Sequence, residues 1–199
     1  MAWGKAGSTT LSSSGDTLTT STFTPSTFNM FMVHVLKTGG NARGFGRVGN
    51  NTIDTGSNYA YGRSPNGGAK SNFTSQSVLY TPDVEDTSTE FHVGYYLNIS
   101  GEEKLFIMNI IQDGGSGAGN DPDRAKEVSK WANTSSQINI QQVYNTAGGD
   151  LDTNSNITVL GSDITPAAGS SVTVSDGAVF YETDNNKEYV LYNNTWTEV

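Results

Sequence analysis

The chain of 199 residues contains no cysteine, which removes several kinds of chemistry at once. A disulfide framework, a zinc–thiolate site, a thiol nucleophile and an iron–sulfur cluster all need cysteine. Cationic side chains are also scarce, because 11 Lys and Arg stand against 20 Asp and Glu. A nucleic-acid-binding protein needs a basic footprint, and this sequence offers none. No run of 18 apolar residues occurs, so no membrane-spanning helix is expected.

The first twenty residues lack a basic stretch followed by an apolar stretch. We therefore expect no secretory signal in the chain as numbered, and a signal removed before numbering would give the same sequence.

What the chain has instead is an excess of small polar residues. Ser, Thr, Asn and Gly together make up 88 of the 199 residues. Such residues suit turns, strand surfaces and polar loops, and they suit long helices poorly. Leu, Ile, Val and Phe are sparse, so the core is expected to be thin. The composition predicts an all-β protein with long connections.

Three segments read as the strongest strands. Residues 28–36 carry apolar side chains on both faces, which predicts a central strand of a β-sandwich. Residues 90–100 and 104–112 are expected to form a hairpin around Gly101. The second of these runs is continuously apolar, which predicts burial on both sides.

The other segments are less regular. Residues 122–131 are the one good helix candidate, with Asp121 as N-cap and Pro122 in the first turn. Residues 41–77 are either a set of short strands or a loop region with its own packing, and 77–81 are expected to form a strand.

Three regions are expected along the chain. Residues 1–165 form the main β-sandwich domain, and residues 166–170 form a linker rich in Pro, Ala and Gly. Residues 171–199 read as a small β-meander, with strands at 171–174, 178–183, 188–192 and 195–199. A sheet of about four short strands is marginal by itself, so this module should dock on a larger surface.

The sequence gives little sign of catalysis, and we expect no enzyme. Residues 44–49 match the spelling G-x-G-x-x-G, but no helix pattern follows, as a dinucleotide site would require. His34 and His92 are expected to be satisfied histidines in strands. Paired carboxylates can hydrolyse glycosides, yet Glu102 and Glu103 fall in a hairpin turn and should be solvated.

No cofactor is expected either. Asp150, Asp152, Asn154 and Asn156 alternate, and oxygen ligands on loops can hold Ca²⁺. The spelling of an EF-hand is absent, and polar loop composition explains the run, so calcium stays the weaker alternative.

Aromatic side chains offer candidate contacts with a partner or a glycan, because aromatic rings can stack on sugars. The candidates are Trp3, Tyr59, Tyr61, Arg63, Tyr189 and Trp196, with residues 1–10 as a natural anchoring arm. Core packing is the competing explanation for most aromatic residues of an all-β protein.

Four parts of the chain share a pattern of Gly, Ser, Thr and Asn with a few aromatic residues: 2–18, 58–62 with 66–68, 130–143 and 145–161. Together they resemble uncharacterised surface proteins of tailed, marine-type bacteriophages. A separate element in the tail, E-T-D-x-x-K-x-Y followed by Trp196, resembles a short motif of phage appendage and surface proteins. Its sequence spans 182–189, where Asp184-Asn185-Asn186 predicts a tight turn between two strands.

The resemblance implies a jelly-roll-like β-sandwich displayed on a virion, made in the host cytoplasm and released by lysis. It implies a structural role, as a capsid decoration (cement) protein or a surface appendage that assembles with neighbouring subunits. The expected partners are further copies of the chain, with a homotrimer favoured, and the major capsid or other virion proteins. The alternative is a receptor- or carbohydrate-binding module of a phage fibre, with Tyr59, Tyr61 and Arg63 in its site.

Overall fold

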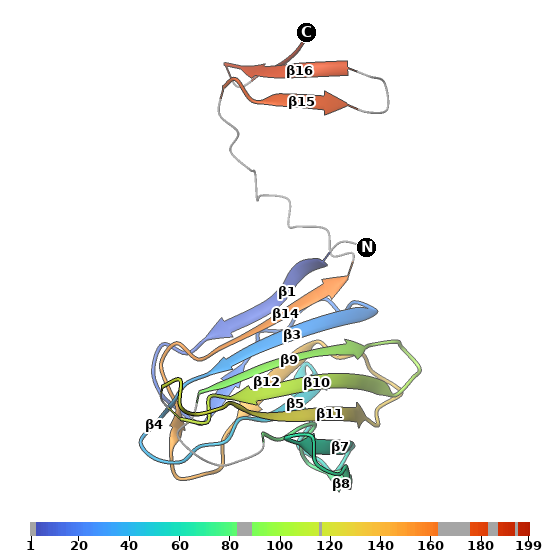
Figure 1. Ribbon diagram of the computed structural model, residues 1–199. Helices are drawn as coiled ribbons and strands as arrows, with labels where there is room; N and C mark the ends of the chain where they lie inside the picture. The colour runs from blue at the N-terminus through green and yellow to red at the C-terminus, as the bar shows by residue number, and fades with distance from the viewer. Residues whose placement is uncertain (1–2, 83–88, 116, 163–175, 183–186, 194) are drawn as a thin grey trace. The chain divides into compact units, whose positions relative to one another are not determined.

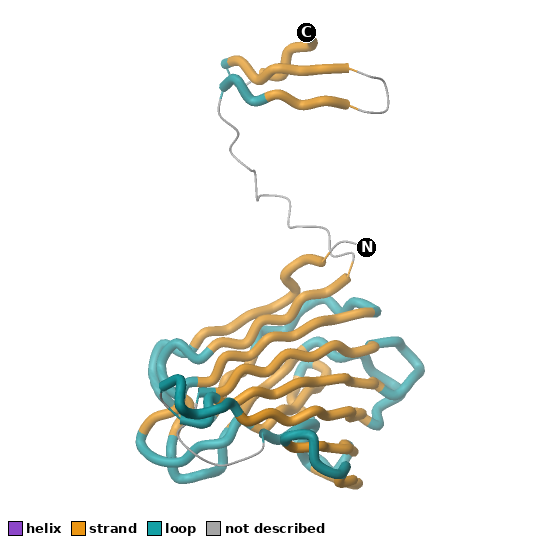
Figure 2. Tube along the Cα trace, viewed as in Figure 1, coloured by secondary structure: helices purple, strands orange, loops and turns teal. Residues whose placement is uncertain are grey.

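The computed structural model describes residues 3–82, 89–115, 117–162, 176–182, 187–193 and 195–199. The chain divides into two compact units, Met1–Ile164 and Thr165–Val199, and each is described by itself. The described residues contain strands and no helix, so the predicted all-β class is confirmed (Figures 1 and 2). The jelly-roll connection of the strands remains a prediction.

The first unit is built on an antiparallel sheet of eight strands (Figure 1). Its strands run in the spatial order β1 (Trp3–Thr10), β14 (Asn156–Ser162), β3 (Phe28–Val35), β9 (Glu90–Leu97), β10 (Lys104–Gln112), β11 (Asp123–Trp131), β7 (Tyr59–Pro65) and β8 (Ser71–Gln76).

A smaller sheet packs on one face of this large sheet, behind it in Figure 1. Its strands run in the order β2 (Thr17–Thr19), β12 (Ile140–Tyr144), β5 (Phe45–Asn50) and β6 (Thr52–Ile53). A short pair, β4 (Lys37–Thr38) with β13 (Asp150–Leu151), completes the unit. The core lies between the sheets, where Leu18 and Val143 of the small sheet meet Phe31, Val33 and Ile110 of the large one.

The expectation that β10 is buried on both sides is wrong for the single chain. Phe106, Met108 and Ile110 point into the core, whereas Leu105 and Ile107 are 57% and 64% exposed. The same holds for β3, whose even-numbered positions face away from the core. Only one face of the large sheet is covered by the small one, and successive side chains of a strand point to opposite faces.

The predicted helix at 122–131 is also wrong, because Asp123–Trp131 is strand β11. It pairs with β10 along its whole length and with β7 on the other side. Its side chains alternate, with Ala125, Glu127 and Trp131 inward and Lys126 and Val128 outward. This period of two matches a sheet, so tertiary pairing overrides the helix-start signal at Asp121 and Pro122.

Residues 41–77 form short strands, β5 to β8, and not a loop region. Residues 77–81, in contrast, do not form the predicted strand. Leu79 and Tyr80 are fully buried there, and two backbone hydrogen bonds and an isolated bridge tie them to Gly46.

The second unit contains a three-stranded antiparallel sheet of β15 (Val179–Glu182), β16 (Lys187–Tyr192) and β17 (Thr195–Glu198). The predicted turn at Asp176 and Gly177 precedes it. The predicted first strand at 171–174, the linker at 166–170 and the turn at 184–186 lie outside the described residues.

Candidate interaction surface

The face of the large sheet that points away from the core is apolar and uncovered, and we call it the open face. Eight of its large hydrophobic side chains are at least 40% exposed: Trp3, Phe28, Phe91, Tyr95, Leu105, Ile107, Ile111 and Val128. Buried large side chains are ordinary, but a contiguous set of exposed ones indicates an interaction site.

Strand register brings these side chains into rows. Leu160 lies opposite Met30, Met30 opposite Tyr95, Tyr95 opposite Ile107, and Ile107 opposite Val128. Directly opposed side chains on one face of a sheet lie about 4.5–5.5 Å apart at Cβ and contact each other. One unbroken apolar row therefore crosses five strands, from β14 to β11.

The open face is large enough for a protein interface. With about 4.8 Å between strands and about 3.3 Å per residue, eight strands of about eight residues cover about 1,000 Å². A stable interface buries about 800 Å² on each partner, so the face as a whole is of this size.

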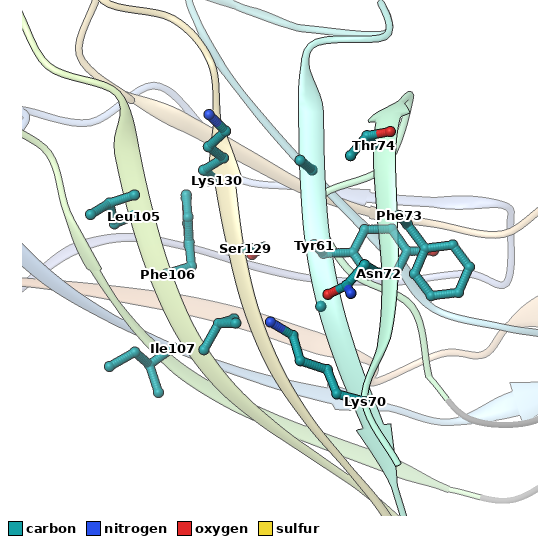
Figure 3. Close-up of a pocket in the computed structure, with 13 residues that line it drawn as sticks. Tyr61, Lys70, Asn72, Phe73, Thr74, Leu105, Phe106, Ile107, Ser129 and Lys130 are labelled. Carbon is teal, nitrogen blue, oxygen red and sulfur yellow. The ribbon is translucent and has the colours of Figure 1, made fainter.

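Three shallow hollows run across the open face, with volumes of about 620, 400 and 410 Å³. Ile107 lines all three, and Leu105 lines two of them, so the hollows are continuous. Figure 3 shows the largest hollow, with Leu105 and Ile107 on β10, Lys130 on β11 and Lys70 on the side of β8.

The charges of the open face are all positive along its described strands. Lys5 lies on β1, and Arg124, Lys126 and Lys130 occupy the outward positions of β11. No Asp or Glu occupies an outward position of these eight strands, although the whole chain has a net charge of −9. Lys130 is paired with Glu103 of the β9–β10 hairpin at 2.7 Å. The outward positions of β3, β9 and β10 are uncharged, with His34 counted as neutral, so an apolar centre is flanked by cations.

Trp3 is the one predicted contact residue that lies on the open face. It is 44% exposed and lines a hollow with Phe28 and Tyr95. Residues 3–10, however, do not form a free anchoring arm. They form β1, which pairs with β14 from Trp3 to Thr10.

Tyr59, Tyr61 and Arg63 do not form the predicted exposed site. Tyr59 is 1% exposed, and its hydroxyl lies 2.8 Å from the carbonyl oxygens of both Val48 and Asp54. Tyr61 is 8% exposed and stacks on Phe73 with ring centroids 4.6 Å apart. Both rings serve packing, so neither offers the free face that stacking on a sugar needs.

Arg63 points to a buried carboxyl group. Its Nε lies 3.7 Å from Oε1 of Glu127, which is buried in the first unit. The backbone N–H of Thr81 donates to both carboxyl oxygens of Glu127 over 3.4 Å. Burial outweighs these long contacts and raises the pKa of Glu127 to about 8.

Tyr189 and Trp196 lie in the second unit, on β16 and β17. Tyr189 pairs with Glu198 and Leu191 pairs with Trp196, so the two rings share one face at diagonal positions. Trp196 is 43% exposed and Tyr189 is half-buried. Both stay candidate contact residues.

A second polar cluster lies inside the sandwich. Nζ of Lys37 lies 2.8 Å from Oε1 of Glu90 as an ion pair, and Nε2 of His92 lies 2.8 Å from Oε2 of Glu90, with all three side chains buried. The hydroxyl of Tyr80 lies 3.5 Å from Nδ1 of His92. The expectation of a satisfied histidine is confirmed for His92. His34, in contrast, is exposed on the open face.

The described residues contain no group of three or more His, Cys, Asp or Glu side chains placed to hold a metal ion. They also contain no helix long and apolar enough to cross a membrane. A comparison with protein families, with curated proteins and with solved structures finds no match for this chain.

Apart from Trp3, the residues of the open face are not among the contact residues predicted from the sequence. The signal was present, because the run from Leu105 to Ile111 has apolar residues at outward and inward positions alike. This pattern predicts burial on both sides, whereas the described part of the first unit covers only the inward half.

Proposed function

We propose that the chain is a structural protein of a virion surface, either a capsid decoration (cement) protein or a surface appendage. It acts by assembling with neighbouring subunits, and the open face of the large sheet is the surface through which it does so. The function lies in the contacts that this face makes and not in a reaction.

The observation that carries the proposal is the unbroken apolar row across the open face. Tyr95, Ile107 and Val128 lie side by side at its centre and are each about half exposed or more. Leaving such a row in water is unfavourable by about 25 cal/mol for each Å² of apolar surface, so a covering surface is favoured. The resemblance of 2–18 and of the tail motif to phage surface proteins supports a virion as the place of assembly.

The experiment is binding of the purified full chain to empty capsids of the virus that encodes it. We expect saturable binding of many copies per particle, counted by mass photometry or by quantitative gel analysis of sedimented capsids. A decoration protein should reach hundreds of copies, and an appendage protein tens or fewer.

A matched pair of variants tests the role of the open face. Leu105→Lys places a charge in the apolar centre, whereas Tyr192→Lys changes an equally accessible side chain of the second unit. We expect Leu105→Lys to reduce incorporation into particles and Tyr192→Lys to leave it unchanged. A chain that never associates with capsids or with assembled virions would refute the proposal.

A further inference from the structure

We propose that a second copy of this chain covers the open face, so that two large sheets stack face to face around a twofold axis. The inference rests on the proposed function, because it names the partner of the same surface.

The first argument is that the matching apolar surface is found nowhere else on the described part of the first unit. Nine large hydrophobic side chains are exposed there, and eight of them belong to the open face. The ninth, Ile99, lies at the β9–β10 hairpin. An apolar face is best covered by another apolar surface. In a second copy, the described part of the first unit offers such a surface only at its own open face. A patch that pairs with itself gives a twofold, isologous contact.

The second argument is size and shape. Two sheets pack face to face about 10 Å apart, with their side chains interdigitated, as in the core of a sandwich. The open face of about 1,000 Å² matches the half-interface of about 800 Å² that a stable pair of proteins needs. The three shallow hollows give the side chains of the opposite row somewhere to insert.

The third argument is the distribution of charge. The outward positions of β3, β9 and β10 carry no charge when His34 is neutral, and the cations Arg124, Lys126 and Lys5 lie towards the two sides. An interface with an apolar centre and a polar rim has this arrangement. Because both rims are positive, added salt should screen their repulsion and strengthen the pair. If the partner surface carried carboxylates instead, added salt would weaken the complex, because it would screen the attraction between opposite charges.

A twofold pair differs from the homotrimer expected from the sequence. A trimer needs two different surfaces that fit each other, whereas one self-complementary face is fully covered by a single copy.

The test is the molar mass of the full chain in solution, measured by sedimentation equilibrium over a wide concentration range. We expect a monomer–dimer equilibrium for the native chain. Ile107→Lys should raise the dimer dissociation constant by at least about 30-fold, because it buries an ammonium group in the apolar centre. The matched control is Tyr192→Lys, which should leave the dissociation constant unchanged. The side chain of Tyr192 is 68% exposed, against 64% for that of Ile107.

A thermal melt of each variant separates loss of association from loss of fold. Leu105→Lys provides an independent substitution in the same centre, should Ile107→Lys unfold the chain. Dissociation constants measured at about 50 mM and about 500 mM salt then test the sign of the charge effect, with tighter pairing expected at high salt.

Three outcomes would overturn the inference: a monomer at every concentration, an oligomer that resists both substitutions in the centre, or a trimer. Weaker pairing in high salt would point to an acidic partner surface and would likewise contradict it. A monomer that still binds capsids would refute the twofold pair alone. A dimer that ignores capsids would refute the proposed function alone.

Discussion

The buried carboxyl group of Glu127 should make the protein less stable as the pH rises. Glu127 is 2% exposed, and among the described residues its carboxyl oxygens have only long contacts, at 3.4 Å to the N–H of Thr81 and 3.7 Å to Arg63. Tyr61 also interacts electrostatically with the charges of Glu127 and Arg63. Burial removes water from the carboxyl group, and the long contacts with the protein replace its hydrogen bonds poorly, so the ionised form is disfavoured.

The magnitude follows from the pKa. Burial raises the pKa of Glu127 from the ordinary 4.5 to about 8. Between these two values the folded protein keeps a proton that the unfolded chain releases, so the free energy of unfolding falls as the pH rises through this window. The stabilising effect is complete below pH 4.5 and is lost by about pH 8, and its full size is about 5 kcal/mol.

Glu127→Gln removes the titrating proton and keeps the shape of the side chain. The amide lacks good partners, which costs about 1 kcal/mol, so the variant should be more stable than the native chain by about 3–4 kcal/mol at pH 9. At pH 5 the two proteins should differ by about 1 kcal/mol in the opposite direction. Urea unfolding followed by circular dichroism from pH 5 to pH 9 measures both differences.

The control is Glu103→Gln, which changes an exposed carboxylate that pairs with Lys130. Its unfolding free energy should follow the native pH dependence. Parallel curves for Glu127→Gln and the native chain would refute the reasoning. A variant that is less stable by the same amount at every pH would show that Glu127 is ionised and held by Arg63.

Two further substitutions test the packing between the sheets by chemical unfolding. Gly46→Ala should cost at least about 2 kcal/mol, because its Cβ would lie 1.9 Å from the buried ring of Tyr80, whereas Gly15→Ala has open space and should change stability by under about 0.5 kcal/mol. An unchanged Gly46→Ala protein would mean that the ring can move aside. Glu90→Gln should cost about 3–5 kcal/mol, because the buried ammonium of Lys37 would face a neutral amide, and a loss below about 1 kcal/mol would contradict this view of the cluster.

The fold class was predictable because composition and strand periodicity act locally. Short runs of alternating or apolar residues predict β3, β9 and β10 close to their observed bounds. The β9–β10 hairpin was predictable for the same reason, since its turn lies in one short segment with Gly101 at positive φ.

Strand β11 shows where such local reasoning fails. Asp121 and Pro122 give a genuine helix-start signal, and Ala125 and Lys126 favour helices. The segment is nevertheless a strand, because Ala125, Glu127 and Trp131 fill inward positions between β10 and β7. The pairing partners lie far away in the sequence, at Tyr59–Pro65 for β7, so no local pattern could reveal them.

The burial of Tyr59 and Tyr61 could not be predicted for a related reason. Tyr59 and Tyr61 are candidates from the sequence because aromatic rings can stack on sugars, yet they pack beside Val48 and Phe73. Burial of a ring depends on the layer above it, and the sequence does not tell which sheet will provide that layer.

The strand pattern itself contains an argument for a missing layer. A strand with water on one face alternates apolar and polar side chains, whereas a strand covered on both faces is apolar throughout. Strand β10 has Leu105, Ile107 and Ile111 outward and Phe106 and Ile110 inward, and apart from Asn109 its residues from Leu105 to Ile111 follow the pattern of a doubly covered strand. The described part of the first unit supplies one layer over this strand, the inward one. The pattern of β10 therefore indicates one more covering layer than the first unit provides, and the proposed second copy would supply that layer.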